Sequence, residues 1–288
     1  MPGIRIVNSS NRRPAFPNDS GTDPVGGNEK SSRSDDPKPV FRPPDMRGVA
    51  LPVLHRDPGF LVLNKPSGLL SIPGRGLLAQ DSVISRVAEW HPEAEGSLMV
   101  HRLDMDCSGL ILVALNKQTQ RSLAHQFEHR EVEKTYQSLV EGRVEQAEGQ
   151  ITLPFRLDPD NRPHQVYDPI HGKPGVTNFV VLGFESLSRT PEFTSPDLGS
   201  TDPQNDRPVR ATPDRNAVTR VRFEPLTGRT HQLRLHAAHP LGLGRPIVGD
   251  RLYGDPSLAP RLMLHATEIG FSHPGSGRSI RFRSAPPF

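Results

Sequence analysis

The sequence holds a single cysteine, Cys107, and no apolar run approaches the roughly 20 residues that cross a membrane. One cysteine cannot form an intramolecular disulfide or a cysteine-rich metal site, and such a composition is typical of a reducing compartment. The beginning of the chain lacks the short apolar core that follows the basic start of a signal peptide. We therefore expect a soluble, cytoplasmic protein with no membrane contact.

Apolar residues are also scarce, because 34% of the 288 residues are hydrophobic and 6% are aromatic. The shortfall is concentrated in residues 1–49 and about 186–216, which are rich in Pro, Ser, Asp, Asn and Arg and show no apolar periodicity. We predict that residues 1–49 form a disordered N-terminal extension. Residues 50–288 then form one domain, with a disordered insertion at about 186–216.

The net charge of the chain excludes few classes of protein. The 35 basic residues outnumber the 32 acidic ones by three. Such a small excess permits an acidic partner such as nucleic acid but does not indicate one. The function must therefore be inferred from sequence motifs. No internal repeat is visible in the sequence.

The pattern of apolar residues predicts strands and fewer helices. Alternation from Thr219 to Phe223 indicates a half-buried strand with Arg220 and Arg222 turned outward. Other strands are expected at 60–63, 110–115, 135–142 and 176–184, and helices at 81–90, after Asn116, and after Thr227, where His231, Arg234, Leu235 and Ala238 would share a face. The fold class is therefore α+β, with a mixed, largely antiparallel central sheet flanked by helices.

Four stretches occur in order along the chain: "NKPSGLLSIPGR", "HRLDMDCSGLILVAL", "EKTYQSLVEG", and "GRTHQLRLHAAHPLG" followed by "PIVGDRLYG". Together they resemble the RluA-type pseudouridine synthases. The likeness extends to "NRPHQV" and "GKP", so it spans nearly all of residues 54–288 outside the insertion. It is strongest with the small dual-specificity members that modify both tRNA and large-subunit rRNA, and it implies the pseudouridine synthase fold.

Pseudouridine formation breaks the bond between ribose C1′ and uracil N1, turns the base and rejoins it through C5. The reaction has no net redox change, so we expect no cofactor and no metal. An ionised carboxylate can attack C1′ or remove the 2′ proton of the ribose. The resemblance implies that Asp104 of the "HRLD" motif is this carboxylate.

The resemblance assigns two further catalytic residues. Arg234 matches the family arginine that pairs with the catalytic aspartate, and arginine suits a buried carboxylate because its fork is always charged. Tyr136 matches the tyrosine whose ring stacks on the target base and whose hydroxyl assists proton removal at C5. Leu233 matches an apolar residue of the same pocket.

The target uracil lies stacked in folded RNA and must be flipped out, at a cost of about a few kcal/mol. Arg102 matches the arginine that fills the vacated space. The expected substrate-binding set is Arg102, Leu233, Arg229, His231 and Lys134.

Several residues also have plainer interpretations. Asp104 and Asp106 could form a carboxylate pair that binds a metal, although no third ligand is evident. His231 and His236 are five residues apart, a poor helical spacing for one metal ion, so structural hydrogen bonds are expected. Lys65 and Arg75 could contact phosphate or only solvent.

One position departs from the family pattern. Cys107 stands where the family usually has threonine, and a thiol is a weaker hydrogen-bonding group than a hydroxyl. The exchange leaves the catalytic groups in place but could loosen the loop that carries Asp104.

The leading prediction is an RNA pseudouridine synthase that modifies a tRNA anticodon loop, an rRNA hairpin loop, or both, and acts as a monomer. One alternative is a non-catalytic RNA-binding or ribosome-assembly factor on the same fold. A second is a metal-dependent nuclease that uses Asp104 and Asp106. No N-terminal RNA-binding domain is expected, because residues 1–49 are too polar and rich in proline.

Overall fold

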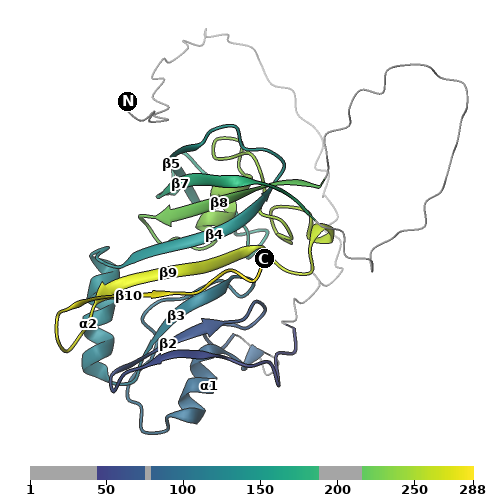
Figure 1. The fold of residues 1–288 in the computed structure, drawn as a ribbon. Helices are drawn as coiled ribbons and strands as arrows, with labels where there is room; N and C mark the ends of the chain where they lie inside the picture. Colours follow the sequence, from purple (N-terminus) through teal and green to yellow (C-terminus); the bar gives the residue numbers. More distant parts are fainter. Residues whose placement is uncertain (1–43, 75–78, 188–215) are drawn as a thin grey trace, which may run out of the picture.

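The computed structural model describes residues 44–74, 79–187 and 216–288 (Figure 1). Their centre is a ten-stranded sheet in the order β1-β2-β3-β9-β4-β8-β7-β5-β6, with β10 paired to β9. All neighbours are antiparallel except β3 and β9. The α+β prediction with a largely antiparallel mixed sheet is confirmed.

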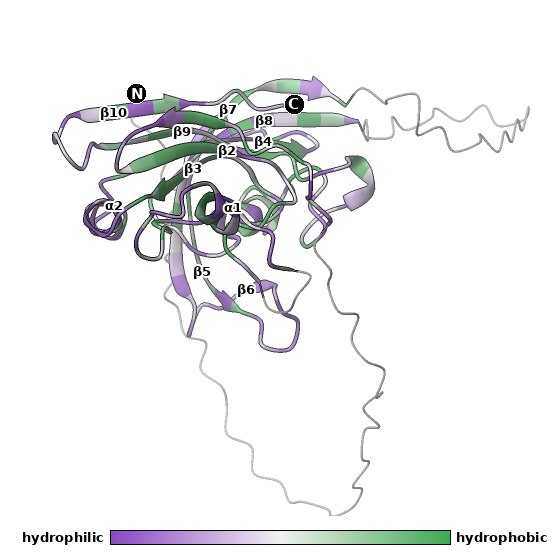
Figure 2. Cartoon of the chain, turned by 90° about the horizontal axis from the view of Figure 1, so that it is seen from below, coloured by the Kyte–Doolittle hydropathy of each residue, from purple (hydrophilic) through white to green (hydrophobic). Residues whose placement is uncertain are grey.

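The strands are β1 (Val53–Arg56), β2 (Phe60–Lys65), β3 (Ser108–Ala114), β4 (Glu133–Glu141), β5 (Glu148–Leu157), β6 (Gln165–Tyr167), β7 (Lys173–Ser186), β8 (Ala217–Pro225), β9 (Leu264–Ser272) and β10 (Ser279–Arg283). The α-helices are α1 (Val83–Trp90), α2 (Lys117–Glu128) and α3 (Gln232–Ala238), and a short 3-10 turn covers Pro256–Leu258. Figure 2 shows hydrophobic residues concentrated in the middle strands of the sheet, with α1 and α2 on one side of it.

Strand β3 is the most buried strand, with all seven of its residues inaccessible. It pairs with β2 along its length and with β9 through Ser108 and Gly109. Gly109 has φ +110°, and a Cβ there would lie 2.4 Å from the carbonyl oxygen of Ala266. Only glycine permits this close approach, so the residues just before β3 are held against β9.

Two helices begin where the sequence predicts. Ser82 caps α1 in a capping box with Ser85, and the side chain of Asn116 accepts a hydrogen bond from the backbone N–H of Thr119 at the start of α2. These caps satisfy backbone donors that have no partner inside the helix. Local sequence therefore defines both helix starts.

The third helix differs from its prediction. Helix α3 begins only at Gln232, because His231 adopts a left-handed conformation with φ +55° and precedes the helix. His231 therefore does not share a helical face with Arg234. Six of the seven helix residues are buried, so α3 is a core element and has no solvated face.

The two predicted disordered segments fall largely outside the described residues, namely at 1–43 and 188–215, and remain predictions. The ends of the insertion lie side by side, because Ser186 of β7 pairs with Ala217 of β8. The end of the N-terminal segment contacts the domain, since Arg86 donates hydrogen bonds to the carbonyl oxygens of Met46 and Val49. Over the described ranges, no helix has the length and apolarity that crossing a membrane requires.

Candidate active site

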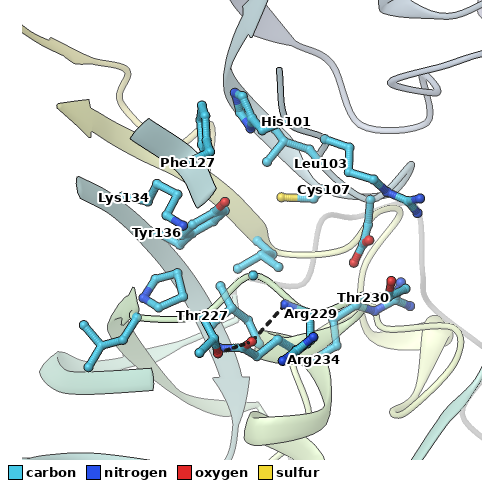
Figure 3. Close-up of a pocket in the computed structure, with 18 of the residues that line it drawn as sticks. His101, Leu103, Cys107, Phe127, Lys134, Tyr136, Thr227, Arg229, Thr230 and Arg234 are labelled. Carbon is cyan, nitrogen blue, oxygen red and sulfur yellow. Dashed lines mark hydrogen bonds between the residues drawn. The ribbon is translucent and has the colours of Figure 1, made fainter. Parts of the chain in front are cut away.

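A cavity of about 450 Å³ opens between the loop before β3, the beginning of β4 and the segment that joins β8 to α3 (Figure 3). Seven of the eight predicted site residues line it: Arg102, Asp104, Lys134, Tyr136, Arg229, Leu233 and Arg234. The eighth, His231, does not. These residues come from sequence positions more than 130 apart, so the sheet brings the predicted motifs to one place.

Lys65 supports the loop that carries Asp104 from inside the core. It is fully buried, and its Nζ donates to the carbonyl oxygens of Pro66 at 3.0 Å, Leu69 at 2.7 Å and Met105 at 2.9 Å. Burial lowers the pKa of Lys65 to about 8, although the three carbonyl groups favour the charged form. Both sequence interpretations, contact with phosphate or with solvent, are wrong for Lys65, and Arg75 lies outside the described residues.

The rest of the "NKPSGLLS" segment fixes the same loop. The hydroxyl of Ser67 donates to the carbonyl of Asp106 at 2.6 Å. Ser71 donates to the carbonyl of Leu103 at 2.7 Å and accepts the N–H of Leu103 at 3.0 Å. Backbone groups on both sides of Asp104 are therefore paired, which holds its side chain at the cavity.

Arg234 is buried and lies against a carboxylate that the sequence does not single out. Its Nε and Nη2 donate to the two carboxylate oxygens of Asp250 at 2.8 and 2.5 Å, and its Nη1 lies 3.6 Å from Oδ2 of Asp106. Burial opposes the charge of Arg234, but the hydrogen bonds to Asp250 and the attraction of Asp250, Asp104 and Asp106 together raise its pKa. Within the described part of the chain no ion pair within 4 Å joins Arg234 to Asp104, although Asp104 helps to raise the pKa of Arg234, so the predicted pairing stays a prediction. Asp250 binds Nε and Nη2 of Arg234 because it is fully buried and presents both carboxylate oxygens to them.

Tyr136 lies near the beginning of β4, where the strand pairs with Phe223 of β8 on one side and Ala266 of β9 on the other. Its register with β9 shifts between Thr135 and Tyr136. Burial raises the pKa of the Tyr136 phenol well above its usual value. The hydroxyl is therefore protonated at neutral pH and can donate a hydrogen bond to a bound substrate.

His101 and Phe127 form a further wall of the cavity (Figure 3). The two rings stack with centroids 4.5 Å apart and an angle of 21°. The Nε2 of His101 accepts the N–H of Leu112 at 2.9 Å, and burial, reinforced by Lys134, lowers the pKa of His101 to about 3. His101 is thus neutral, with its proton on Nδ1. It stands in the "HRLD" motif, but only the fold shows that it lines the cavity.

Gln232 fixes the segment between β8 and α3. Its side-chain oxygen accepts from the hydroxyl of Thr227 at 2.7 Å and from the N–H of Arg229 at 3.0 Å. Its side-chain nitrogen donates to β7, at the carbonyl of Val176 and the hydroxyl of Thr177. All four hydrogen-bonding positions of this buried amide are used, which holds the exposed Arg229 at the rim of the cavity.

His231, which precedes α3, and His236, within α3, differ in their contacts. The Nδ1 of His231 lies 3.0 Å from the hydroxyl of Tyr253, which also accepts the N–H of Gln165. His231 therefore has a structural hydrogen bond and does not line the cavity, and its predicted contact with substrate stays a prediction. His236 is fully buried, yet neither ring nitrogen has a hydrogen-bond partner among the described residues, so the structural hydrogen bonds expected for it are not present.

The structure gives the metal-site alternative no third ligand. Asp106 receives a hydrogen bond from Nε of Arg251 at 2.8 Å and lies near Arg234. In the described ranges no group of three or more His, Cys, Asp or Glu residues could hold a metal ion.

A cavity lined by a carboxylate, a phenol and basic side chains suits an enzyme that acts on a nucleobase turned out of its strand. Comparison with known proteins narrows this class. A model of the RNA pseudouridylate synthase family matches residues 59–239. The chain belongs to this family, as its motifs predict, and its activity is that of an RNA pseudouridine synthase, an isomerase.

Individual relatives support the same assignment. The dual-specificity RNA pseudouridine synthase RluA of Pasteurella multocida is 42% identical over 241 residues, which cover 83% of this chain and 94% of the relative. The protein of the same name from Escherichia coli K12 is 40% identical with the same coverage. The structure of human RNA pseudouridylate synthase domain containing 1 has a TM-score of 0.61 and 27% identity, covering 83% of this chain and 84% of the human chain.

Proposed function

We propose that the chain converts uridine to pseudouridine in a tRNA anticodon loop and in a hairpin loop of large-subunit rRNA, with Asp104 as the reacting carboxylate. The observation that carries the assignment concerns Asp104 itself. Its backbone is fixed on both sides, yet in the described part of the chain no hydrogen bond or ion pair occupies its carboxylate. A carboxylate held at a cavity without a structural partner is available for chemistry.

Two routes satisfy the balance of the reaction. In the first, Asp104 attacks C1′, the C1′–N1 electron pair passes to the uracil, and C5 later displaces the carboxylate. In the second, Asp104 removes the 2′ proton, the uracil leaves to give a glycal, and C5 adds to C1′ as the proton returns. In both, C5 finally loses its proton and N1 gains one. Both need Asp104 ionised.

The walls of the cavity suit the other tasks. The ring of Tyr136 can stack on the target base. Because its hydroxyl is protonated, it can donate a hydrogen bond near C5 or relay a proton there without first losing its own proton. Arg102 and Arg229 are exposed at the rim, where they can approach phosphates, and Arg102 can fill the space that a flipped base leaves. Leu233 and Lys134 line the interior.

The dual target is proposed from the names of the relatives together with the form of the site. Both kinds of RNA would present a hairpin loop, which proteins recognise by shape and by unstacked bases. We further propose that the protein acts as a cytoplasmic monomer, which sedimentation of the purified chain would test.

A non-catalytic RNA-binding factor would use the same basic rim, but the family and the relatives favour the enzyme. Such a factor has no need of an unpaired carboxylate inside a cavity. The metal-dependent nuclease has less support, since Asp106 is already held by Arg251.

The test is tritium release from 5-tritiated uridine in an anticodon stem-loop RNA and in an rRNA hairpin RNA, with chelator present. Wild type is compared with Asp104→Asn and with Glu89→Gln, an exposed carboxylate of α1, as the control. We expect release by wild type and Glu89→Gln and none by Asp104→Asn. Binding of both RNAs without release by any variant would favour the RNA-binding factor, and release from one RNA alone would reject the dual target.

A further inference from the structure

We propose that Asp250 is a positioning residue of this reaction, which sets the guanidinium of Arg234 beside the cavity and acts on catalysis only through it. The inference rests on the proposed function, because it concerns how the arginine next to Asp104 is placed. Asp250 lies in "PIVGDRLYG", sixteen residues after Arg234, and it is not one of the residues that line the cavity.

The contacts of Asp250 leave its carboxylate no freedom to rotate. Oδ2 accepts Nε of Arg234 at 2.8 Å and Oδ1 accepts Nη2 at 2.5 Å. Oδ1 also accepts the backbone N–H groups of Leu252 at 2.9 Å and Tyr253 at 3.2 Å. The turn after Asp250 therefore fixes the carboxylate, and two parallel hydrogen bonds transmit that fixed orientation to the planar guanidinium.

Two further contacts restrict the remaining edge of Arg234. The ring of Tyr253 lies 5.5 Å from Cζ, and Nη1 lies 3.6 Å from Oδ2 of Asp106. Asp106 is itself held by Nε of Arg251 at 2.8 Å. Nη1 is thus the one guanidinium nitrogen not used by Asp250, and it belongs to a residue that lines the cavity together with Asp104.

The charge of the buried Arg234 side chain also supports a positioning role for Asp250. Arg234 is buried, and an unpaired buried guanidinium would be drawn to whichever carboxylate could reach it. Asp104 and Asp106 both attract it. Asp250 binds Nε and Nη2 of Arg234 and so fixes the position of the guanidinium. In the described structure the carboxylate of Asp104 is therefore left without an ion pair. Asp250 therefore keeps Asp104 available for the ribose.

Asp250 cannot be a catalytic residue in the sense of touching RNA, because its exposed fraction is 0%. Its substitution should change turnover and leave RNA binding intact. A residue that serves only the fold would change the melting temperature and leave the turnover of the folded fraction unchanged.

The test is a double-mutant cycle on the full chain with Asp250→Asn, Arg234→Lys and the double variant. The readouts are kcat from tritium release, the Kd for the same RNA, and the melting temperature. We expect Asp250→Asn to lower kcat on the order of 10- to 100-fold. The Kd should change less than about twofold, and in the Arg234→Lys background Asp250→Asn should cost little more.

A matched control is available in Asp81. Its two oxygens accept Nε and Nη2 of Arg86 at 2.7 and 2.8 Å, the same fork geometry away from the cavity. Asp81→Asn should leave kcat unchanged. Independent, multiplying losses in the cycle, or an unchanged kcat for folded Asp250→Asn, would overturn the proposal.

A second variant guards against loss of folding. If Asp250→Asn does not fold, Asp250→Glu retains the charge and displaces the fork by one methylene, and it should lower kcat with the same non-additivity toward Arg234→Lys. Failure of the proposed function is distinguishable, because then wild type itself would release no tritium and bind RNA all the same.

Discussion

The Nζ of Lys65 lies 2.9 Å from the carbonyl oxygen of Met105, the residue that follows Asp104. A lysine of the first motif thus supports the catalytic loop of the second from within the core. The same Nζ also holds Pro66 and Leu69, so one buried cation ties the two loops together.

Lys65→Met should therefore destabilise the fold and lower turnover. Three carbonyl groups, buried or partly buried, would lose their donor, which costs on the order of 2–4 kcal/mol of unfolding free energy. We expect a lower urea midpoint and a kcat that falls more than RNA affinity does. The control is Lys117→Met, since the Lys117 side chain is 64% exposed. A wild-type kcat in folded Lys65→Met would contradict the role in positioning Asp104.

Cys107→Thr should leave kcat unchanged or slightly raised. Cys107 is 2% exposed and lines the cavity, and burial raises the pKa of its thiol to about 12. The thiol is therefore protonated at neutral pH and is a poor nucleophile. Cys107→Val, of similar shape but without a polar group, separates hydrogen bonding from packing. A collapse of turnover in the threonine variant would show that the thiol takes part in the reaction.

Acid should destabilise the protein partly through His236. Burial lowers its pKa to about 4 from the usual 6.5, so the folded state resists a proton that the unfolded chain takes up. Its contribution is present above about pH 6.5 and is lost as the pH falls toward about 4, by up to about 3 kcal/mol. His101 and His265 act in the same direction.

Urea unfolding at pH 7 and pH 5 measures this effect. The loss of unfolding free energy between the two should be smaller for His236→Leu than for wild type. His171→Leu removes an exposed histidine and should leave the loss unchanged. An equal loss in wild type and His236→Leu would show that His236 does not resist protonation.

Removal of residues 1–43 should leave the rate at saturating RNA unchanged, because every residue that lines the cavity lies between Val100 and Leu264. The removed segment carries Arg5, Arg12, Arg13 and Lys30, so its loss should weaken RNA binding slightly, and more at low salt. The cut must precede Met46, whose carbonyl binds Arg86. A truncated protein that binds RNA but does not turn it over would refute this expectation.

Local sequence is a good guide wherever neighbouring residues decide the structure. The helices expected at 81–90 and after Asn116 both form, and the alternation in β8 matches its buried and outward residues. Strands β1, β5, β6, β9 and β10 are not predicted. Their formation depends on partners distant in the chain, as β9 shows by pairing with both β3 and β4.

The same limit applies within the site. The order of the motifs and their resemblance to one family predict Asp104, Tyr136 and Arg234, and all three line the cavity. The motifs do not show that His231 turns toward Tyr253, because that follows from one left-handed backbone angle. Nor do they show that His101 lines the cavity, because that depends on the packing of α2 against β3.

The sequence by itself determined the family and its activity, because motifs in a fixed order match that family, and it singled out Asp104, Tyr136 and Arg234 as candidates for the reaction. The tertiary structure decided which charges meet. Asp104, Asp106 and Asp250 all stand near Arg234, and only the buried turn that presents both oxygens of Asp250 binds the fork. Hydrogen bonds of this kind form only when atoms of distant segments are placed to within tenths of an ångström. Only the packed chain defines such positions.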